Sequence, residues 1–230
     1  MVFSMESRGS VTRPRLIRDG ESEPRNVGMY QACPMDEKGW FNLGPQNSET
    51  LTKMEVNRKV IVEVNRNLPV CLGGAEEAVH ISKVDFIVEA PEDQVPFDAP
   101  AVQPSEIDKQ IAGRVMEKIT DGSVIQLGIG GMPDAVGKMI AESDLKDLGG
   151  HTEMFVDAYV DMIESGKMNG ARKAFDRNRV AYTFAIGSRR MYPDIRQRAE
   201  AMINLAHPDF RDDLIKAAQV QRIWKQCNKK

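Results

Sequence analysis

The chain has 230 residues, of which 31 are Lys or Arg and 34 are Asp or Glu, so its formal net charge is −3. This weak acidity gives no overall attraction to nucleic acid or anionic lipid, and 41% hydrophobic residues are enough for a folded core. No apolar run reaches the ~20 residues that a membrane-spanning helix needs. The three cysteines (Cys33, Cys71 and Cys227) form neither a zinc pattern nor a disulfide framework, which favours a reducing cytoplasm.

Residues 1–25 differ from the rest of the chain. They combine five arginines with four acidic residues and contain no apolar segment, so neither a transit peptide nor a signal peptide is indicated. We expect a disordered tail here, because the segment has little apolar surface to bury.

The segment from residue 26 to residue 100 contains two apolar, β-branched runs, at 59–64 and 84–88, which predict buried strands. Residues 34–39 contain Pro, Asp and Gly and predict a turn, followed by a short strand or loop at 40–44. Four prolines then fall within residues 91–104, which predicts a linker or a long surface connection.

An alternating pattern begins at Ser105. Ser105 with Asp108 three residues later predicts a helix N-terminus of the capping-box type, and an apolar residue every fourth position from Ile107 to Ile119 predicts one helix face. We expect strands at 124–127 and 180–186, a helix starting at Pro133, another helix through about Ser165, and two helices closing the chain. The order helix, strand, helix, helix, strand over 105–186 predicts an α/β fold with a mostly parallel sheet.

The first candidate functional segment is the turn Gly128-Ile129-Gly130-Gly131-Met132-Pro133, between a predicted strand and a predicted helix. Free backbone N–H groups and the helix dipole at such a position favour an anion or a developing oxyanion. A tight strand–helix turn without function is the plain alternative. A dinucleotide site is disfavoured, because the sixth position is Pro133 and no acidic residue falls at the end of a second strand.

The second candidate is Glu153, which we place at a strand–helix junction among Met154, Phe155 and Val156. Apolar neighbours are expected to desolvate its carboxylate partly and so to raise its pKa or its nucleophilicity. A structural acid at a helix start is the alternative. Asp157 and Asp161 are expected on a solvated acidic helix face, and the three widely spaced histidines predict no metal site.

These two segments, Ile125 to Val136 and Asp147 to Asp157, closely resemble the acetyl-CoA hydrolase/transferase family, and within it the butyryl-CoA:acetate and 4-hydroxybutyrate CoA-transferases. The likeness extends to residues 34–44, 76–82, 197–203 and 206–215. The resemblance implies a NagB/RpiA/CoA-transferase-like open, mostly parallel sheet with part of a second related domain. It divides the chain into a remnant of the N-terminal domain at 26–100 and a C-terminal domain at 104–230.

The resemblance also implies a mechanism. Glu153 would be the covalent nucleophile, and Gly128, Ile129, Gly130, Gly131 and Met132 would bind CoA. CoA would move between short-chain acyl-CoA and acetate through a glutamyl-CoA thioester, with CoA as substrate and product and with no permanent cofactor or metal. The partners implied are acyl-CoA and a short-chain carboxylate, and neither nucleic acid nor a membrane. Whether the chain forms a homo-oligomer is left open.

Compared with the family pattern, the chain reads as an N-truncated and internally deleted version, with a deletion near residues 193–195. A second hypothesis therefore stands beside the transferase: a catalytically inactive fragment that at most binds CoA or a partner. A trapped glutamyl-CoA adduct would distinguish the two.

Overall fold

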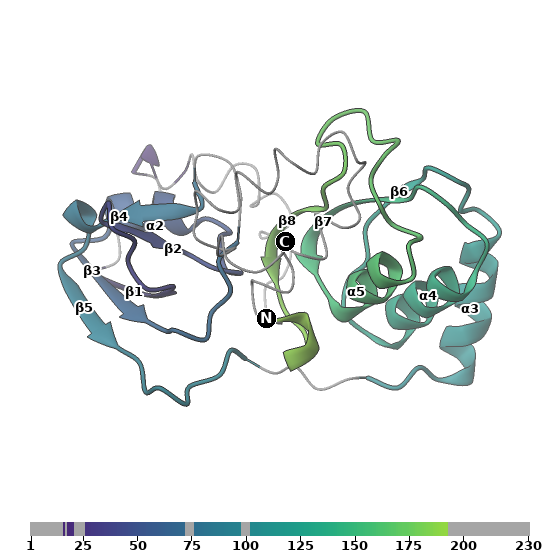
Figure 1. Ribbon diagram of the computed structural model, residues 1–230, viewed down its shortest axis with the longest axis horizontal. Coiled ribbons are helices and arrows are strands. Elements are labelled where there is room, and N and C mark those ends of the chain that lie inside the picture. Colours follow the sequence, from purple (N-terminus) through teal and green to yellow (C-terminus); the bar gives the residue numbers. More distant parts are fainter. Residues whose placement is uncertain (1–15, 17, 21–25, 72–75, 98–101, 193–230) are drawn as a thin grey trace, which may run out of the picture. The chain divides into compact units, whose positions relative to one another are not determined.

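The computed structural model describes residue 16 and residues 18–20, 26–71, 76–97 and 102–192 (Figure 1). The chain divides into a unit of residues 1–191 and a second unit of residues 192–230, and every helix and strand named below belongs to the first. The predicted deletion near 193–195 and the predicted closing helices lie outside the described residues, as does most of the predicted tail. Arg18 is described, and its guanidinium donates hydrogen bonds to Thr52 at 3.2 Å and Glu55 at 3.5 Å.

The first sheet is three-stranded and parallel, in the order β1 (Val27–Ala32), β3 (Lys59–Val64), β5 (Phe86–Glu89). The predicted strand at 59–64 is confirmed, and its valines alternate with more exposed residues as a strand with one packed face requires. The second run forms β5, but all four of its residues are exposed, so the expectation that it is buried was wrong. Its apolar side chains lie on an edge strand, which has a neighbouring strand on only one side.

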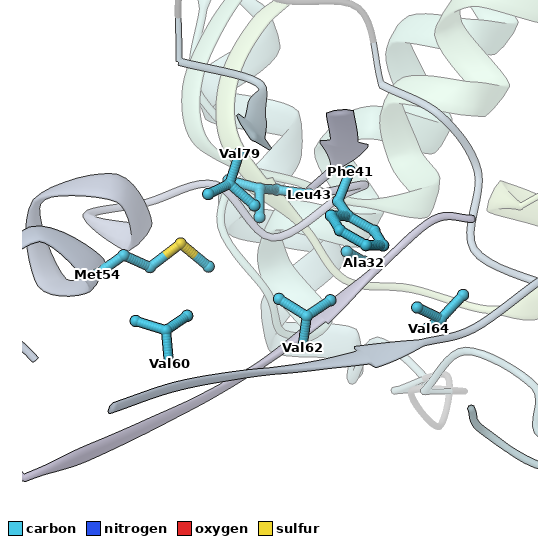
Figure 2. Close-up of a cluster of buried hydrophobic side chains, with 8 residues drawn as sticks. All are labelled: Ala32, Phe41, Leu43, Met54, Val60, Val62, Val64 and Val79. Carbon is cyan, nitrogen blue, oxygen red and sulfur yellow. The ribbon is translucent and has the colours of Figure 1, made fainter. Parts of the chain in front are cut away.

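The core of this part lies on one face of the first sheet. Figure 2 shows Val60, Val62 and Val64 of β3 directed toward side chains from the segments that follow β1 and from α2 (Thr50–Val56). Two short strands, β2 (Trp40–Asn42) and β4 (Ala78–His80), pair antiparallel and contribute Phe41 and Val79. A 3₁₀ turn, η1 (Ile81–Lys83), then leads to β5.

The predicted turn at 34–39 is confirmed. The Asp36 carboxylate accepts hydrogen bonds from the backbone N–H groups of Lys38 (2.9 Å) and Trp40 (2.8 Å), an arrangement typical of an Asx turn. Gly39 has φ 85°, a left-handed conformation that favours glycine. The described residues between β5 and residue 105 contain no helix or strand, as the proline spacing predicts.

The second sheet is also three-stranded and parallel, in the order β6 (Val124–Ile125), β7 (Gly149–Phe155), β8 (Ala181–Ala185). Helices α3 (Glu106–Met116), α4 (Gly131–Glu142) and α5 (Asp157–Glu164) accompany it, and a 3₁₀ turn, η2 (Arg189–Met191), follows β8. Helix α4 contacts both α3 and α5. The predicted α/β fold is therefore confirmed, as is the prediction that the strands near 124 and 181 share one sheet.

Three details of the prediction were wrong. The segment 149–155 was not predicted as a strand, but it is the central strand of the second sheet, and it leads into α5 as expected. Helix α4 begins at Gly131, with Gly130 as its N-cap, rather than at Pro133. The expected apolar face of α3 is largely exposed, with Ile107 at 68% and Ile111 at 46%, because the helix buries Ala112 instead.

The predicted capping box of α3 is present. The Ser105 side chain accepts a hydrogen bond from the Asp108 N–H, and the Asp108 carboxylate accepts one from the Ser105 N–H at 2.9 Å. In the part of the chain that the structure describes, no helix is both long and apolar enough to cross a membrane.

Candidate functional site

The glycine-rich turn lies where the sequence predicts, at the carboxyl end of β6. Residues 126–130, which include Gly128, Ile129 and Gly130, connect the strand to α4, and Ile129 is 64% exposed. Gly130 has φ 126°, which favours glycine. Among the hydrogen bonds of the described residues, none is donated by the backbone N–H groups of Gly128 and Ile129. These groups are therefore free to donate to a ligand.

Gly131 is held by a close approach. A Cβ atom at this position would lie 2.8 Å from the Asp108 Oδ2 atom and 3.2 Å from the Pro104 Cα atom. The capping box of α3 therefore packs against the first residue of α4, and a larger side chain would have to push backbone aside. This contact fixes the start of α4 and, with it, the end of the glycine-rich turn.

Glu153 lies inside β7 rather than at a helix start, and its side chain is exposed. The expected desolvation of this carboxylate was therefore wrong within the described residues. The reason is the alternation of side chains along a strand. Thr152 is buried on one face of β7, so Glu153 must point to the other face.

The register of the second sheet relates Glu153 to the glycine-rich turn. Ile125 of β6, three residues before Gly128, pairs with Gly150 of β7, three residues before Glu153. The Thr152 Oγ1 atom lies 3.4 Å from the Leu127 carbonyl oxygen, so the two chains stay aligned beyond the paired residues. The two predicted site segments thus belong to β7 and to the turn that follows the neighbouring strand β6.

A tyrosine from α5 reaches the same region. The Tyr159 hydroxyl oxygen accepts a hydrogen bond from the Leu127 N–H at 2.7 Å, and the side chain is fully buried. Burial raises the pKa of Tyr159, while a side-chain hydrogen bond with Thr152 and the Leu127 N–H act in the opposite direction. Sequence analysis did not identify this residue, because no local motif connects it to the turn.

The acidic face expected on α5 is instead hydrogen-bonded. The Asp157 carboxylate accepts hydrogen bonds from the Ser188 N–H (2.8 Å) and the Ser188 hydroxyl (3.0 Å), and Asp161 pairs with Arg190 at 2.6 Å. Burial raises the pKa of Asp134 in α4, and the charges of Asp157 and Asp161 add to this effect. Asp157 and Asp161 thus hold the segment after β8 against α5, so the expectation of a solvated acidic face was wrong.

A cavity of about 430 Å³ opens between the first sheet and the end of β8. Gln46 and Phe184 form a backbone bridge there, and the Ala185 N–H donates a hydrogen bond of 2.8 Å to the Pro45 carbonyl oxygen. Sequence analysis identified none of the lining residues, because only pairing between distant segments brings them together. They are Met29, Tyr30, Gln31, Gln46, Ser48, Thr50, Phe184, Ala185 and Ile186.

Among the described residues, no group of three or more His, Cys, Asp or Glu side chains is arranged to hold a metal ion. The imidazole of His151 lies edge-on to the Phe175 ring, with 5.8 Å between the ring centroids. This contact is typical of a structural histidine.

Comparison with known proteins identifies the class first. The structure of 4-hydroxybutyrate CoA-transferase from Porphyromonas gingivalis matches with a TM-score of 0.71 and 34% identity, over 80% of this chain and 45% of that one. RipA from Yersinia pestis, at 23% identity and a TM-score of 0.72, shows the same fold. The fold is thus that of the α/β CoA-transferases.

The sequence comparisons are more specific. Residues 22–99 match the model of the acetyl-CoA hydrolase/transferase N-terminal domain. The butyryl-CoA:acetate CoA-transferase of Anaerostipes caccae is 47% identical over 85% of this chain, and a probable butyrate:acetyl-CoA coenzyme A-transferase of Syntrophomonas wolfei is 46% identical over 74%. The chain belongs to the acetyl-CoA hydrolase/transferase family. It spans 43% and 38% of the lengths of these two relatives.

Proposed function

We propose that this chain carries the nucleophile of a CoA-transferase that moves CoA between a short-chain acyl-CoA, butyryl- or 4-hydroxybutyryl-CoA, and acetate. The observation that carries the proposal is the position of Glu153, exposed on β7, the strand that pairs with β6 just before the glycine-rich turn, whose Gly128 and Ile129 N–H groups make no hydrogen bond to a described residue. The names of the relatives support the reaction class and the acyl groups.

Each step of the proposed reaction forms one bond to a carbonyl carbon and breaks another. The Glu153 carboxylate attacks the acyl-CoA carbonyl and expels the CoA thiolate, which leaves a mixed anhydride. The thiolate then attacks the glutamyl carbonyl, so that glutamyl-CoA forms and the first acid leaves as a carboxylate. Acetate attacks glutamyl-CoA, and the same two steps in reverse give acetyl-CoA and free Glu153.

The glycine-rich turn has a matching role in this proposal. Each attack places negative charge on a carbonyl oxygen, and preorganised backbone donors stabilise such an oxyanion. Gly128 and Ile129 supply N–H groups, and the absence of a Cβ at Gly128 and Gly130, where the space is open, lets a thioester approach the backbone. Ile129 and Met132 would contact the pantetheine arm of CoA. The chemistry needs no metal and no resident cofactor.

A second candidate is a domain that binds CoA without transferring it. The observation that favours it is the exposure of Glu153 within the described residues, because a glutamyl-CoA thioester open to water is lost by hydrolysis.

Under either candidate we propose residues 26–100 as N-terminal-domain sequence, supported by the family match at 22–99, and residues 104–230 as C-terminal-domain sequence. The free, buried thiol of Cys33 supports a cytoplasmic location.

The test combines a transfer assay with a binding assay. Purified chain receives butyryl-CoA and acetate, acetyl-CoA is followed by chromatography, and CoA binding is measured by calorimetry. The transferase proposal expects acetyl-CoA from the wild type and from Glu142→Gln, a control at an exposed glutamate at the end of α4, but none from Glu153→Gln. Saturable CoA binding without acetyl-CoA from any variant would favour the second candidate.

A further inference from the structure

We infer that Tyr159 and Thr152 are positioning residues, which together hold the glycine-rich turn and the backbone on both sides of Glu153 in one hydrogen-bonded network. The inference rests on the proposed role of Glu153. Neither side chain is suggested to touch substrate.

The first part of the network holds the entry to the turn. Leu127 immediately precedes Gly128 and lies beyond the paired residues of β6, so its N–H is outside the strand pairing of β6 and β7. That N–H donates to the Tyr159 hydroxyl oxygen at 2.7 Å. The backbone just before the turn is thus fixed by a side chain from α5.

The second part holds the backbone around Glu153. The Thr152 hydroxyl donates to the Met154 carbonyl oxygen at 2.9 Å and lies 3.4 Å from the Leu127 carbonyl oxygen. Leu127 therefore lies between the two side chains: its N–H donates to the Tyr159 hydroxyl oxygen, and its carbonyl oxygen lies beside the Thr152 hydroxyl. Since Thr152 and Met154 flank Glu153, the network connects the turn to the proposed nucleophile.

Burial makes the network difficult to replace. Tyr159 is 0% exposed, Thr152 5% and Leu127 8%, so water cannot readily substitute for a lost hydroxyl. The tyrosine ring is itself fixed, stacked on Phe155 with 5.1 Å between centroids and an interplanar angle of 20°. Its hydroxyl therefore has little freedom to move away from Leu127.

The network should affect the rate of the reaction at Glu153 more than the affinity for CoA. A displacement of about 1 Å between reacting groups can lower a rate ~10²-fold. Loss of the Tyr159 hydroxyl should free the turn to move relative to Glu153. The CoA dissociation constant should change far less, because the exposed surface of the turn is unaltered.

The experiment compares Tyr159→Phe, Thr152→Val and Thr152→Ser with Ser143→Ala. The last is a matched control, because the Ser143 hydroxyl makes similar local bonds at the far end of α4, to the Ile140 carbonyl (2.8 Å) and from the Leu145 N–H (3.2 Å). Two readouts are measured on the folded fraction: hydrogen exchange of residues 126–132, and the first-order rate at which butyryl-CoA modifies Glu153.

We expect Tyr159→Phe and Thr152→Val to speed exchange at 126–132 and to slow modification by about 10- to 100-fold, while Thr152→Ser and Ser143→Ala stay near the wild type. If Tyr159→Phe does not fold, Thr152→Val and Thr152→Ser decide the question alone. Unchanged exchange and an unchanged modification rate in Thr152→Val would overturn the inference. If the wild type is not modified at Glu153, the proposed function fails, and the exchange data still decide whether the network holds the turn.

Discussion

Two helical glycines should respond in opposite ways to replacement by alanine. Gly113 lies in the interior of α3, and a Cβ atom there would meet nothing within 4 Å. Gly137 lies in the interior of α4, and a Cβ atom there would lie 2.5 Å from the Ala158 Cβ and 3.4 Å from the Ala158 Cα. The first substitution should therefore stabilise the fold, and the second should destabilise it.

The magnitudes follow from these contacts. Alanine is favoured over glycine in a helix interior by ~1 kcal/mol, and Gly113→Ala should gain about that amount. Gly137→Ala has the same intrinsic gain, but it forces apart α4 and α5 at atoms attached to backbone. Overpacking of this kind costs about 1–3 kcal/mol, so the net effect lies between neutral and a loss of ~2 kcal/mol. The two variants should thus differ by about 2 kcal/mol, which corresponds to roughly 6 °C in Tm.

Thermal unfolding followed by circular dichroism measures this difference directly. We expect the order Gly113→Ala, wild type, Gly137→Ala from highest to lowest Tm. Equal Tm values for the two variants would refute the close packing of α4 on Ala158. That packing also sets the position of the adjacent Tyr159.

Two further predictions follow from the titrating groups. Because burial raises the pKa of Asp134, its charged form disfavours folding, so Asp134→Asn should have the higher Tm at neutral pH. The advantage should shrink as the pH falls below the raised pKa and the wild-type carboxyl becomes protonated; a Tm difference independent of pH between about 4 and 8 would contradict this. Burial raises the pKa of the Cys33 thiol to about 12, with a further contribution from Cys71. At pH 8, iodoacetamide should therefore modify Cys33 much more slowly in the folded chain than in the chain unfolded by urea, as peptide mass spectrometry would measure, and comparable rates would show that Cys33 is accessible.

Local signals predicted the parts of the fold that local chemistry decides. Ser105 and Asp108 satisfy the first turn of α3 by themselves, and the valines of 59–64 supply a buried strand face without reference to distant residues. The glycine-rich turn was likewise predicted at the end of β6, because glycines after an apolar run and before a helix have few other uses.

The remainder depended on contacts between distant residues. Strand β7 carries two glycines, a histidine and a glutamate, and it is a strand because β6 and β8 pair with it on both sides. The exposure of Glu153 depends on what packs on its face of the sheet, which its apolar neighbours in sequence do not report. The same holds for Ile107 and Ile111. Their spacing predicts that they share one helix face, but it does not predict whether other residues bury that face. The hydrogen bond from Leu127 to Tyr159 joins two segments that no motif relates.

The central claim is that Glu153 accepts CoA covalently, and trapping the intermediate tests it most directly. The chain is incubated with butyryl-CoA without acetate, quenched in acid, digested and mapped by mass spectrometry, with borohydride reduction of a parallel sample. We predict that one peptide, the one containing Glu153, gains the mass of CoA less one water, and that Glu153→Gln abolishes this gain. An adduct on Asp157 or Asp161, or no adduct at saturating butyryl-CoA, would contradict the claim.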